Sequence, residues 1–495
     1  MSNKTKQIDL LNRNSLIMLG KKIQIPGYTN NFSNPYRNME YLKNAIQEEI
    51  KNRKKELKTR SKSVSDLSQN NNLNGNNSNS MNNDNISCYQ GGYGGSYSKL
   101  DVGVCVGLRK SKSSSSISSM ETESNILENN NLNINSADLL NKDFNSCIFP
   151  PQRKLVAIGD IHGDLSVAIK ALKLAQVIDQ RIPDDFLDVS KINWIGGNTF
   201  VVQLGDQIDR VRPSKLFNSL CTEEDEELYE DEGSDLKIIY LFERLNSQAQ
   251  KQGGAVISIL GNHELMNVDG DFRYVSPKEF REFGNRFNGK LEFDSSVPYG
   301  FKERSEAFKP GGFLARRLGK SRYSVVQVGS WLFVHGGITS ECAKNYSLQK
   351  INEHIGRWLL GDISEKNMKC VHDLYHRDDD EHSPFWCRTY SDMEDWGQDA
   401  LIEFNKTMNL INLWNAKNND LRANGIVMGH SPQFMYGRGI NSSINNRIWR
   451  VDVGASRAFG KVDKNKDANR LVQILVILND GKNPNKDFQI IQEKG

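Results

Sequence analysis

Four short strings in this chain place Asp, Asn and His directly after apolar runs. They are GDIHGD from Gly159, GDQIDR from Gly205, GNHE from Gly261 and GHS from Gly429, and the runs before them are LVAI, FVVQL, VISIL and IVM. Each run has the character of a buried strand. Because polar residues that follow buried parallel strands meet at one edge of a sheet, these strings can gather into one site.

Hydrolysis of a phosphate monoester needs a hydroxide near neutral pH, neutralisation of a dianion and a proton for the departing oxygen. Two divalent metal ions that share a carboxylate meet the first two needs. We expect Asp160 and His162 to bind the first metal and Asp206 to bridge the pair. The ligands expected for the second metal are Asn262, His335 and His430. This mixed oxygen and nitrogen set suits Mn, Fe or Zn.

Residues beside these ligands are candidates for proton transfer and phosphate binding. His263 follows Asn262, so its imidazole can face the substrate and protonate the leaving oxygen, and Asp209 can hold that imidazole. Arg210 and Arg388 are predicted to clamp the phosphate because a guanidinium binds two phosphate oxygens at once. Asn262 is predicted to contact the phosphate as well as a metal.

A single Asp or His at a strand end is more often a turn former than a ligand. Here, however, four of the eight histidines fall beside glycines at successive predicted strand ends. That concentration favours a functional site. Glu264, in the GNHE string, is predicted to orient one of the ligands from behind.

Composition divides the 495 residues near residue 150. We predict a low-complexity, largely disordered N-terminal extension over 1–150, because its Asn, Ser and Gly tracts carry few apolar residues to offset the entropy of ordering. Apolar residues at helical spacing predict one amphipathic helix within it, over 38–60. The catalytic domain is predicted over 151–485.

Charge and cysteine content narrow the class of protein. The net charge is only +3, and its small basic excess lies in the extension, so we do not expect nucleic acid as a partner. Seven cysteines without a CxxC pair fit a reducing compartment. No signal peptide or membrane span is expected, which predicts an intracellular protein, cytoplasmic or nuclear, without a membrane partner. The sequence does not predict an oligomeric state.

Two polar segments have alternative interpretations. The acidic run over 223–236 is expected to be a solvated loop, and the alternative is an element that repels acidic substrates or docks a basic partner. A second cluster contains His372, His376 and His382. Its irregular spacing favours a solvated lid over an additional metal site.

Secondary structure in the second part of the chain alternates between strand and helix. LVAIGD is followed by a helix that Asp164 can cap, which forms a βα unit. Further strands are expected at TFVVQLG, AVISILG, YSVVQVG, SWLFVHG, GIVMGH, RIWRVDVG and LVQILVIL. Helices between several of these strands predict an α/β fold.

Taken together, GDIHGD, GDQIDR, GNHE, VHGG and GHS resemble the calcineurin-like metallophosphoesterase superfamily over about residues 152 to 480. GDQIDR, LGNHELMN, PFWCR at 384–388 and RVDVGAS from Arg450 are similar to the Shewanella-like protein phosphatases, a branch of the phosphoprotein phosphatases. The chain departs from classical Ser/Thr phosphatases at Leu260 and Val211, where those enzymes have Arg and Gly. It also has RVDVGAS in place of their SAPNY string. We therefore do not expect this chain to share the inhibitors and regulatory subunits of the classical enzymes.

The resemblance implies a four-layer αββα metallophosphoesterase sandwich with a dinuclear metal centre. It also implies dephosphorylation of phosphoproteins at Ser/Thr or Tyr, with direct attack by a bridging hydroxide. Arg388 matches the second phosphate-binding arginine of this family. Trp386 is expected to pack beneath the site, and Asp452 is a candidate for supporting the metal ligands.

Two other functions remain open from the sequence. The same metal centre could hydrolyse a small phosphate ester, a dinucleoside polyphosphate or another phosphodiester. Alternatively, the folded domain could be a binding scaffold that acts through its disordered tail. All six expected metal ligands are present in the sequence, which favours an enzyme over a scaffold.

Overall fold

The computed structural model describes residues 146–494 apart from 213–229, 285–297, 376–381, 392–397, 419 and 463–466. The predicted extension, with its helix over 38–60, lies outside the described residues except for its last five. Two of these, Ile148–Phe149, form strand β1, which pairs in parallel with β5 (Val325–Val328). The folded structure therefore includes residues just before the predicted domain start at 151.

One sheet carries the first three motif strings. Its order is β11-β10-β2-β3-β4, and β2, β3 and β4 are parallel neighbours. The bounds are β2 Lys154–Ile158, β3 Phe200–Gln203, β4 Ala255–Ser258, β10 Gln473–Leu478 and β11 Phe488–Gln492. The antiparallel strand β10 completes the sheet on the other side of β2. The strings after β2, β3 and β4 consequently leave the sheet at the same edge.

The other sheet carries the remaining strings. Its order is β1-β5-β6-β7-β9-β8, and β6, β7 and β9 run parallel to one another. The bounds not yet given are β6 Trp331–Val334, β7 Gly425–Met428, β8 Asn441–Ser443 and β9 Ile448–Arg450. VHGG follows β6, GHS follows β7 and DVGAS follows β9. Three more polar strings therefore share an edge of this sheet.

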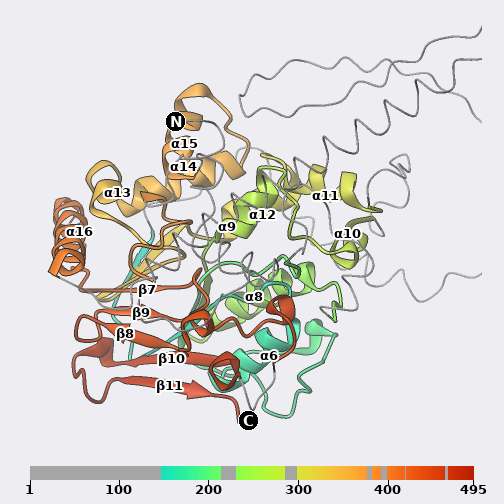
Figure 1. Cartoon of the computed structure of the whole chain (residues 1–495), viewed down its shortest axis with the longest axis horizontal. Helices are drawn as coiled ribbons and strands as arrows, with labels where there is room; N and C mark the ends of the chain where they lie inside the picture. Colours follow the sequence, from blue (N-terminus) through green and yellow to red (C-terminus); the bar gives the residue numbers. More distant parts are fainter. Residues whose placement is uncertain are drawn as a thin grey trace, which may run out of the picture. The chain divides into compact units, whose positions relative to one another are not determined.

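The two sheets pack face to face around one hydrophobic core. Side chains of Val156 and Val202 from one sheet and Phe333 and Val427 from the other belong to the same buried cluster. Helices α6 and α8 cover the first sheet, and α12, α14 and α16 pack with the outer side chains of the second. In Figure 1 the strands accordingly lie between α16 and the pair α6 and α8. The predicted α/β, four-layer αββα fold is confirmed.

The helices connect the strands and close the outer layers. Their bounds are α6 Leu165–Leu174, α8 Asp235–Gln250, α9 Asn262–Val268, α10 Pro277–Gly284, α11 Phe301–Phe308, α12 Phe313–Ser321, α13 Ser340–Asn345, α14 Leu348–Leu359, α15 Glu365–Leu374 and α16 Gln398–Lys417. None of the helices in the described part of the chain is long and apolar enough to cross a bilayer.

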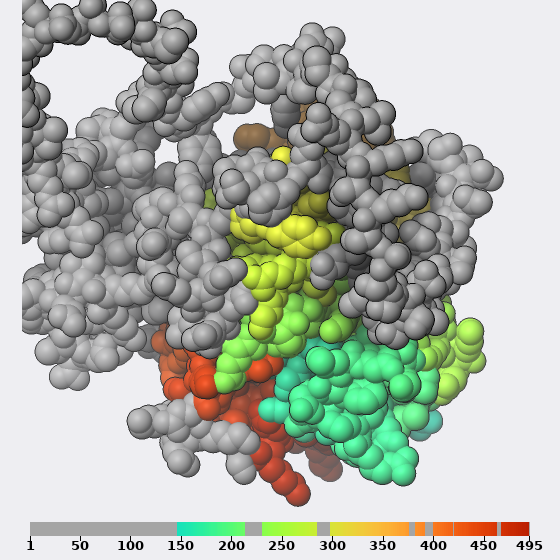
Figure 2. Space-filling model, turned by 90° about the vertical axis from the view of Figure 1, so that its right-hand side faces the viewer, coloured from blue at the N-terminus to red at the C-terminus, as the bar shows by residue number. Residues whose placement is uncertain are grey.

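The predicted βα unit forms as expected. Asp164 is the N-cap of α6, and its carboxylate accepts a hydrogen bond from the Val167 amide. The segment from α6 to β3, blue-green in Figure 2, lies at the surface beside part of the red C-terminal region. Contacts between α6 and β10 agree with this arrangement.

All eight strands expected from apolar runs are present. Three further strands, β1, β8 and β11, were not predicted. They span two, three and five residues, and only Phe488 and Ile491 of β11 are half-buried among exposed neighbours. Short edge strands of this kind lack the continuous apolar run that made the central strands recognisable.

Candidate metal and catalytic site

Strand ends from both sheets converge on one cluster of polar side chains. Asp160 and Asp206 follow β2 and β3, while His335 and His430 follow β6 and β7. Asn262 and His263 begin α9, directly after β4. All six side chains are buried or nearly so. A Cβ atom at Gly429 would collide with the Asp160 carboxylate, so glycine at this position allows the two sheet edges to meet.

Several of the site residues have left-handed backbone conformations. The φ angles are 47° at His162, 51° at Asp206, 74° at Asp209 and 68° at His430. Residues other than glycine adopt positive φ infrequently, and such strain concentrates at functional sites. The turns after three strands are therefore held in conformations that direct these side chains toward the cluster.

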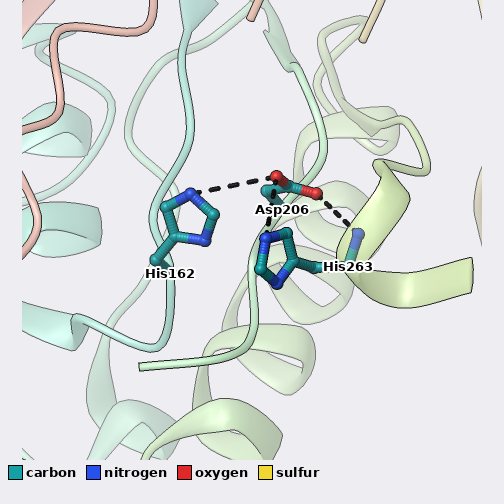
Figure 3. Close-up of side chains that lie close together, drawn as sticks. All are labelled: His162, Asp206 and His263. Carbon is teal, nitrogen blue, oxygen red and sulfur yellow. Dashed lines mark hydrogen bonds and ion pairs between the residues drawn. The ribbon is translucent and has the colours of Figure 1, made fainter. Parts of the chain in front are cut away.

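A first group contains His162, Asp206 and His263, which are drawn in Figure 3. The Nε2 atoms of His162 and His263 lie 3.8 Å and 3.9 Å from Asp206 Oδ2. The other oxygen of Asp206 accepts a hydrogen bond of 3.0 Å from the backbone amide of His263. Asp160 borders this group, with Oδ2 3.9 Å from His162 Nε2.

A second group shares Asp206 and adds His335 and His430. Asp206 Oδ2 lies 3.2 Å from His335 Nε2. Asn262 Oδ1 lies 2.9 Å from the same nitrogen and 3.0 Å from His430 Nδ1. The structure thus brings the six predicted metal ligands together around Asp206, which belongs to both groups.

The electrostatics of the cluster favour metal ligation by two of its imidazoles, His162 and His430. Burial, together with the Arg212 guanidinium, holds the pKa of His162 well below its usual range. Burial and Arg388 do the same to the pKa of His430. Burial acts to raise the pKa of Asp206, but the imidazoles of His335 and His263 outweigh it and hold that pKa well below normal. Burial acts to lower the pKa of His335, but Asp206 outweighs it and raises that pKa. The neutral imidazoles of His162 and His430, beside an ionised carboxylate, are suitable metal ligands.

An excess of buried carboxylates provides a second test of fit. Burial and the nearby charge of Asp452 raise the pKa of Asp160 well above its usual value. Burial raises the pKa of Asp452 to about 6. Among the described residues, Asp452 Oδ2 and His430 Nε2 are buried atoms without a hydrogen-bond partner. These residues fit divalent cations, because cations would compensate the buried negative charge.

The predicted proton donor and its partner are in direct contact. His263 Nδ1 lies 2.7 Å from Asp209 Oδ2. Asn267 donates to both oxygens of Asp209, at 3.0 Å and 3.1 Å. Behind them, buried Arg304 donates to Asn267 Oδ1 and Asp235 at 2.7 Å and 2.8 Å. The His263 ring is therefore anchored through one nitrogen, while its Nε2 faces Asp206.

Glu264 joins the start of α9 to the turn after β3. Its carboxylate accepts hydrogen bonds from the backbone amides of Gly261, Asp206 and Gln207, at 2.7 Å, 3.0 Å and 2.7 Å. These bonds fix the backbone that presents Asp206. The location agrees with the predicted orienting role, which stays a prediction.

The two predicted phosphate-binding arginines are placed differently. Arg388 Nη1 donates to Ser431 Oγ at 2.9 Å, beside His430. Arg210 has a fully buried side chain whose guanidinium donates to Gly163 O at 2.7 Å and to Glu232 Oε2 at 2.8 Å. The structure therefore brings Arg388 to the cluster, whereas the contacts of Arg210 lead toward Glu232. Their roles in phosphate binding remain predictions.

Three residues near the cluster were not singled out from the sequence. Arg212 Nη2 lies 2.8 Å from His162 Nε2. The Tyr274 ring centroid is 4.8 Å from that of His263, and the Phe459 centroid is 5.5 Å from that of His162. The Arg-Val-Arg sequence at 210–212 could have indicated Arg212 as a further arginine near the site. Nothing in the sequence indicated that either aromatic ring would reach the site.

The end of the acidic run is not a solvated loop. Residues 223–229 lie outside the described residues, but Asp231 and Asp235 are 3% and 0% exposed. Glu232 contacts both Arg210 and Arg457, at 2.8 Å and 3.2 Å. The prediction of a solvated segment is therefore wrong for 231–235, because buried Arg210 and Arg304 pair with Glu232 and Asp235, and Asp231 accepts a hydrogen bond from the Ser276 hydroxyl.

The predicted histidine lid is only partly visible. His376 lies outside the described residues. His382 Nδ1 contacts the Thr339 hydroxyl at 2.9 Å, and His372 is in the last turn of α15.

A third cluster, made of the buried carboxylates of Asp209, Asp235 and Glu279, has the spacing of a metal site. Arg304 lies within 3.3 Å of two of these carboxylates and so compensates part of their charge.

Comparisons with known proteins identify relatives of this chain. The chain is 30% identical to Shewanella-like protein phosphatase 2 of Arabidopsis thaliana over 336 residues, which cover 62% of this chain and 73% of that protein. It is 31% identical to the uncharacterised protein R398 of Acanthamoeba polyphaga mimivirus over 277 residues, 51% of this chain and 98% of that one.

A solved structure of a cold-active protein-tyrosine phosphatase from a psychrophilic Shewanella species is also similar, with 22% identity and a TM-score of 0.45. The similarity covers 70% of this chain and 82% of that one. Residues 153–455 match the calcineurin-like phosphoesterase family. Since this match spans more than half of the sequence and includes each of the convergent strand ends, the chain belongs to the calcineurin-like phosphoesterase family and is a hydrolase of phosphoric ester bonds.

Proposed function

We propose that this chain is a protein phosphatase that hydrolyses phosphomonoesters on Ser/Thr or Tyr residues with two divalent metal ions. The observation that carries the proposal is that Asp206 belongs to two adjacent groups of buried side chains that could hold a metal ion. In the first group, Asp160, which borders it, would be a ligand in place of His263. Bound there, two ions of Mn, or of Fe and Zn, would neutralise the phosphate dianion and supply hydroxide near neutral pH. The proposed ligands are Asp160, His162, Asp206, Asn262, His335 and His430.

The chain's own residues divide the remaining work. His263, held at Nδ1 by Asp209, would donate a proton from Nε2 to the departing oxygen of the substrate. Arg388, beside His430, would hold phosphate oxygens, and the amide of Asn262 would contact the same group. The partly buried rings of Tyr274 and Phe459, beside His263 and His162, would exclude water from the substrate.

A phosphoprotein substrate is supported by similarity to the relative named Shewanella-like protein phosphatase 2. The test is the initial rate on matched phosphotyrosine, phosphoserine and phosphothreonine peptides, with a dinucleoside tetraphosphate alongside. Mn²⁺ is supplied, and parallel reactions contain a chelator. We expect chelator-sensitive turnover of at least one phosphopeptide. Turnover of the dinucleotide alone would contradict the protein-phosphatase proposal and leave a nucleotide hydrolase.

A further inference from the structure

Arg210 is held by acidic and carbonyl oxygens rather than presented to the cluster. Its Nη1 donates to Gly163 O at 2.7 Å, and its Nη2 donates to Glu230 O at 3.1 Å and Glu232 Oε2 at 2.8 Å. The side chain is 0% exposed. For Arg210 to bind a phosphate, Glu232 would have to lose this partner within a buried network, which is costly.

Arg212, two residues later, has the opposite disposition. Its Nη1 donates to the backbone carbonyls of Asp209 and Val211, at 3.2 Å and 2.9 Å. Its Nη2 reaches the cluster and donates to His162 Nε2 at 2.8 Å. One arm of the guanidinium is therefore fixed by the turn after β3, and the other is directed at the predicted ligands.

Two aromatic rings further fix this guanidinium. The Arg212 Cζ atom lies 5.2 Å from the centroid of Tyr274 and 4.7 Å from that of Phe459. Both distances fall within the range of cation–π attraction. Because the backbone carbonyls and the rings order the side chain before substrate arrives, little conformational entropy remains to be lost on binding an anion.

The position of Arg212 complements that of Arg388. Arg388 lies beside His430, in the second group of ligand atoms, and Arg212 lies beside His162, in the first. An anion over the shared Asp206 would therefore have one guanidinium at each group. The lone pair of His162 Nε2 cannot serve a metal and Arg212 together, so metal binding at His162 would end this hydrogen bond while the guanidinium stays directed at the cluster.

We propose that Arg212, rather than Arg210, is the second guanidinium that binds the substrate phosphate, and that Glu232 keeps Arg210 in a structural role. The inference rests on the proposed function for the identity of the anion. It assigns a direct substrate contact to a residue outside the predicted site. Phosphate oxygens are matched acceptors for a guanidinium directed at the ligand cluster.

The test measures binding of inorganic phosphate to the Mn²⁺-loaded full chain by isothermal titration calorimetry. Arg212→Ala is expected to weaken binding roughly 10- to 100-fold, since a hydrogen bond to a charged group is lost. Metal content, measured by elemental analysis, should stay at the wild-type level. Arg212→Lys should bind phosphate more tightly than Arg212→Ala, because it keeps the charge but not the fork.

Two further variants serve as controls. Arg181→Ala removes the same charge from an arginine whose side chain is 90% exposed, and it should bind phosphate like wild type. Arg210→Lys keeps the charge beside Glu232 and should also retain wild-type phosphate affinity. Near-UV circular dichroism checks the folding of each variant, and Arg212→Gln replaces Arg212→Ala if the alanine variant does not fold.

Wild-type phosphate affinity in folded Arg212→Ala or Arg212→Gln would overturn the assignment. So would weakened binding confined to Arg210→Lys. The measurement requires no turnover, so its failure can be separated from failure of the proposed function. If wild type bound phosphate through Arg212 but hydrolysed no phosphopeptide, the protein-phosphatase proposal would fail while the assignment of Arg212 would stand. If wild type bound no phosphate, the assignment of Arg212 would fail, and phosphopeptide turnover would still decide the proposed function.

Discussion

At the scale of single residues, the proposed site separates side chains that would hold metal from one that would move a proton. His263 is adjacent in sequence to the predicted ligand Asn262, yet its Nδ1 is 2.7 Å from Asp209. A ring anchored in this way keeps one orientation. Because Nδ1 is held by Asp209, the ring presents Nε2 to the site, where a leaving oxygen could receive a proton.

Replacing His263 with Ala tests this separation. We expect turnover of p-nitrophenyl phosphate to fall about 100- to 10,000-fold, the range for loss of general acid catalysis, with metal content unchanged. Turnover is measured by absorbance and metal by elemental analysis. Loss of metal in parallel with activity would show that His263 is a ligand rather than the proton donor.

At the scale of elements, the start of α9 and the turn after β3 depend on each other. Glu264 accepts three backbone hydrogen bonds that bind the two segments together. Those bonds hold the backbone of Asp206. A change at Glu264 should therefore alter the proposed metal site, although Glu264 is not itself a proposed metal ligand.

Glu264→Gln preserves size but replaces one acceptor oxygen with a donor. We expect about 10- to 100-fold weaker metal affinity, the usual cost of losing an orienting group behind a ligand. Competition with a fluorescent chelator measures the affinity. Glu243→Gln is the control for metal affinity, because the Glu243 carboxylate pairs with Arg317 and Arg322 instead of with the backbone of the site. Equal metal affinity in the wild type and Glu264→Gln would contradict the orienting role.

A second connection between elements is titratable. Asp164 caps α6 and contacts Arg457 at 2.8 Å. Burial acts to raise the pKa of Asp164, but Arg210 and Arg457 outweigh it and lower that pKa. A carboxyl with a lowered folded pKa contributes stability above its unfolded pKa of about 3.9 and loses it as pH falls through the folded value.

Asp164→Asn keeps an oxygen for the helix cap and removes the charge. We expect it to lower the free energy of unfolding at pH 7 by about 3–5 kcal/mol, the range for breaking a buried ion pair. The difference from wild type should shrink below about pH 4 as wild-type Asp164 becomes protonated. Urea unfolding at pH 7, 5 and 3 measures this, with Asp185→Asn, at an exposed position, as the control. A difference independent of pH would contradict the electrostatic account.

The central strands and the six predicted ligands could be placed from the sequence because each apolar run ends in a polar string. The direction of an arginine side chain could not. Arg210 and Arg212 are two residues apart, and their directions differ because Glu232, more than 20 residues later, folds back onto Arg210. Similarly, the burial of Asp231 and Asp235 depends on tertiary partners that the acidic composition does not reveal.

At the scale of the whole molecule, two packed sheets bring five strand ends to one site. The first group of ligand atoms comes from the ends of β2, β3 and β4, and the second adds the ends of β6 and β7. Asp206 is the residue that both groups share. If Asp206 serves both sites, the two metal sites should be lost together when this carboxylate is changed.

The most direct test compares Asp206→Asn with Asp209→Asn. Asp209 lies three residues after Asp206, and Asp209→Asn removes the carboxylate that contacts His263. Metal per chain and phosphopeptide turnover are measured for both and for wild type. We expect two ions per wild-type chain, loss of metal and turnover in Asp206→Asn, and retained metal with reduced turnover in Asp209→Asn. Wild-type metal content and turnover in Asp206→Asn would contradict a metal centre shared through this carboxylate.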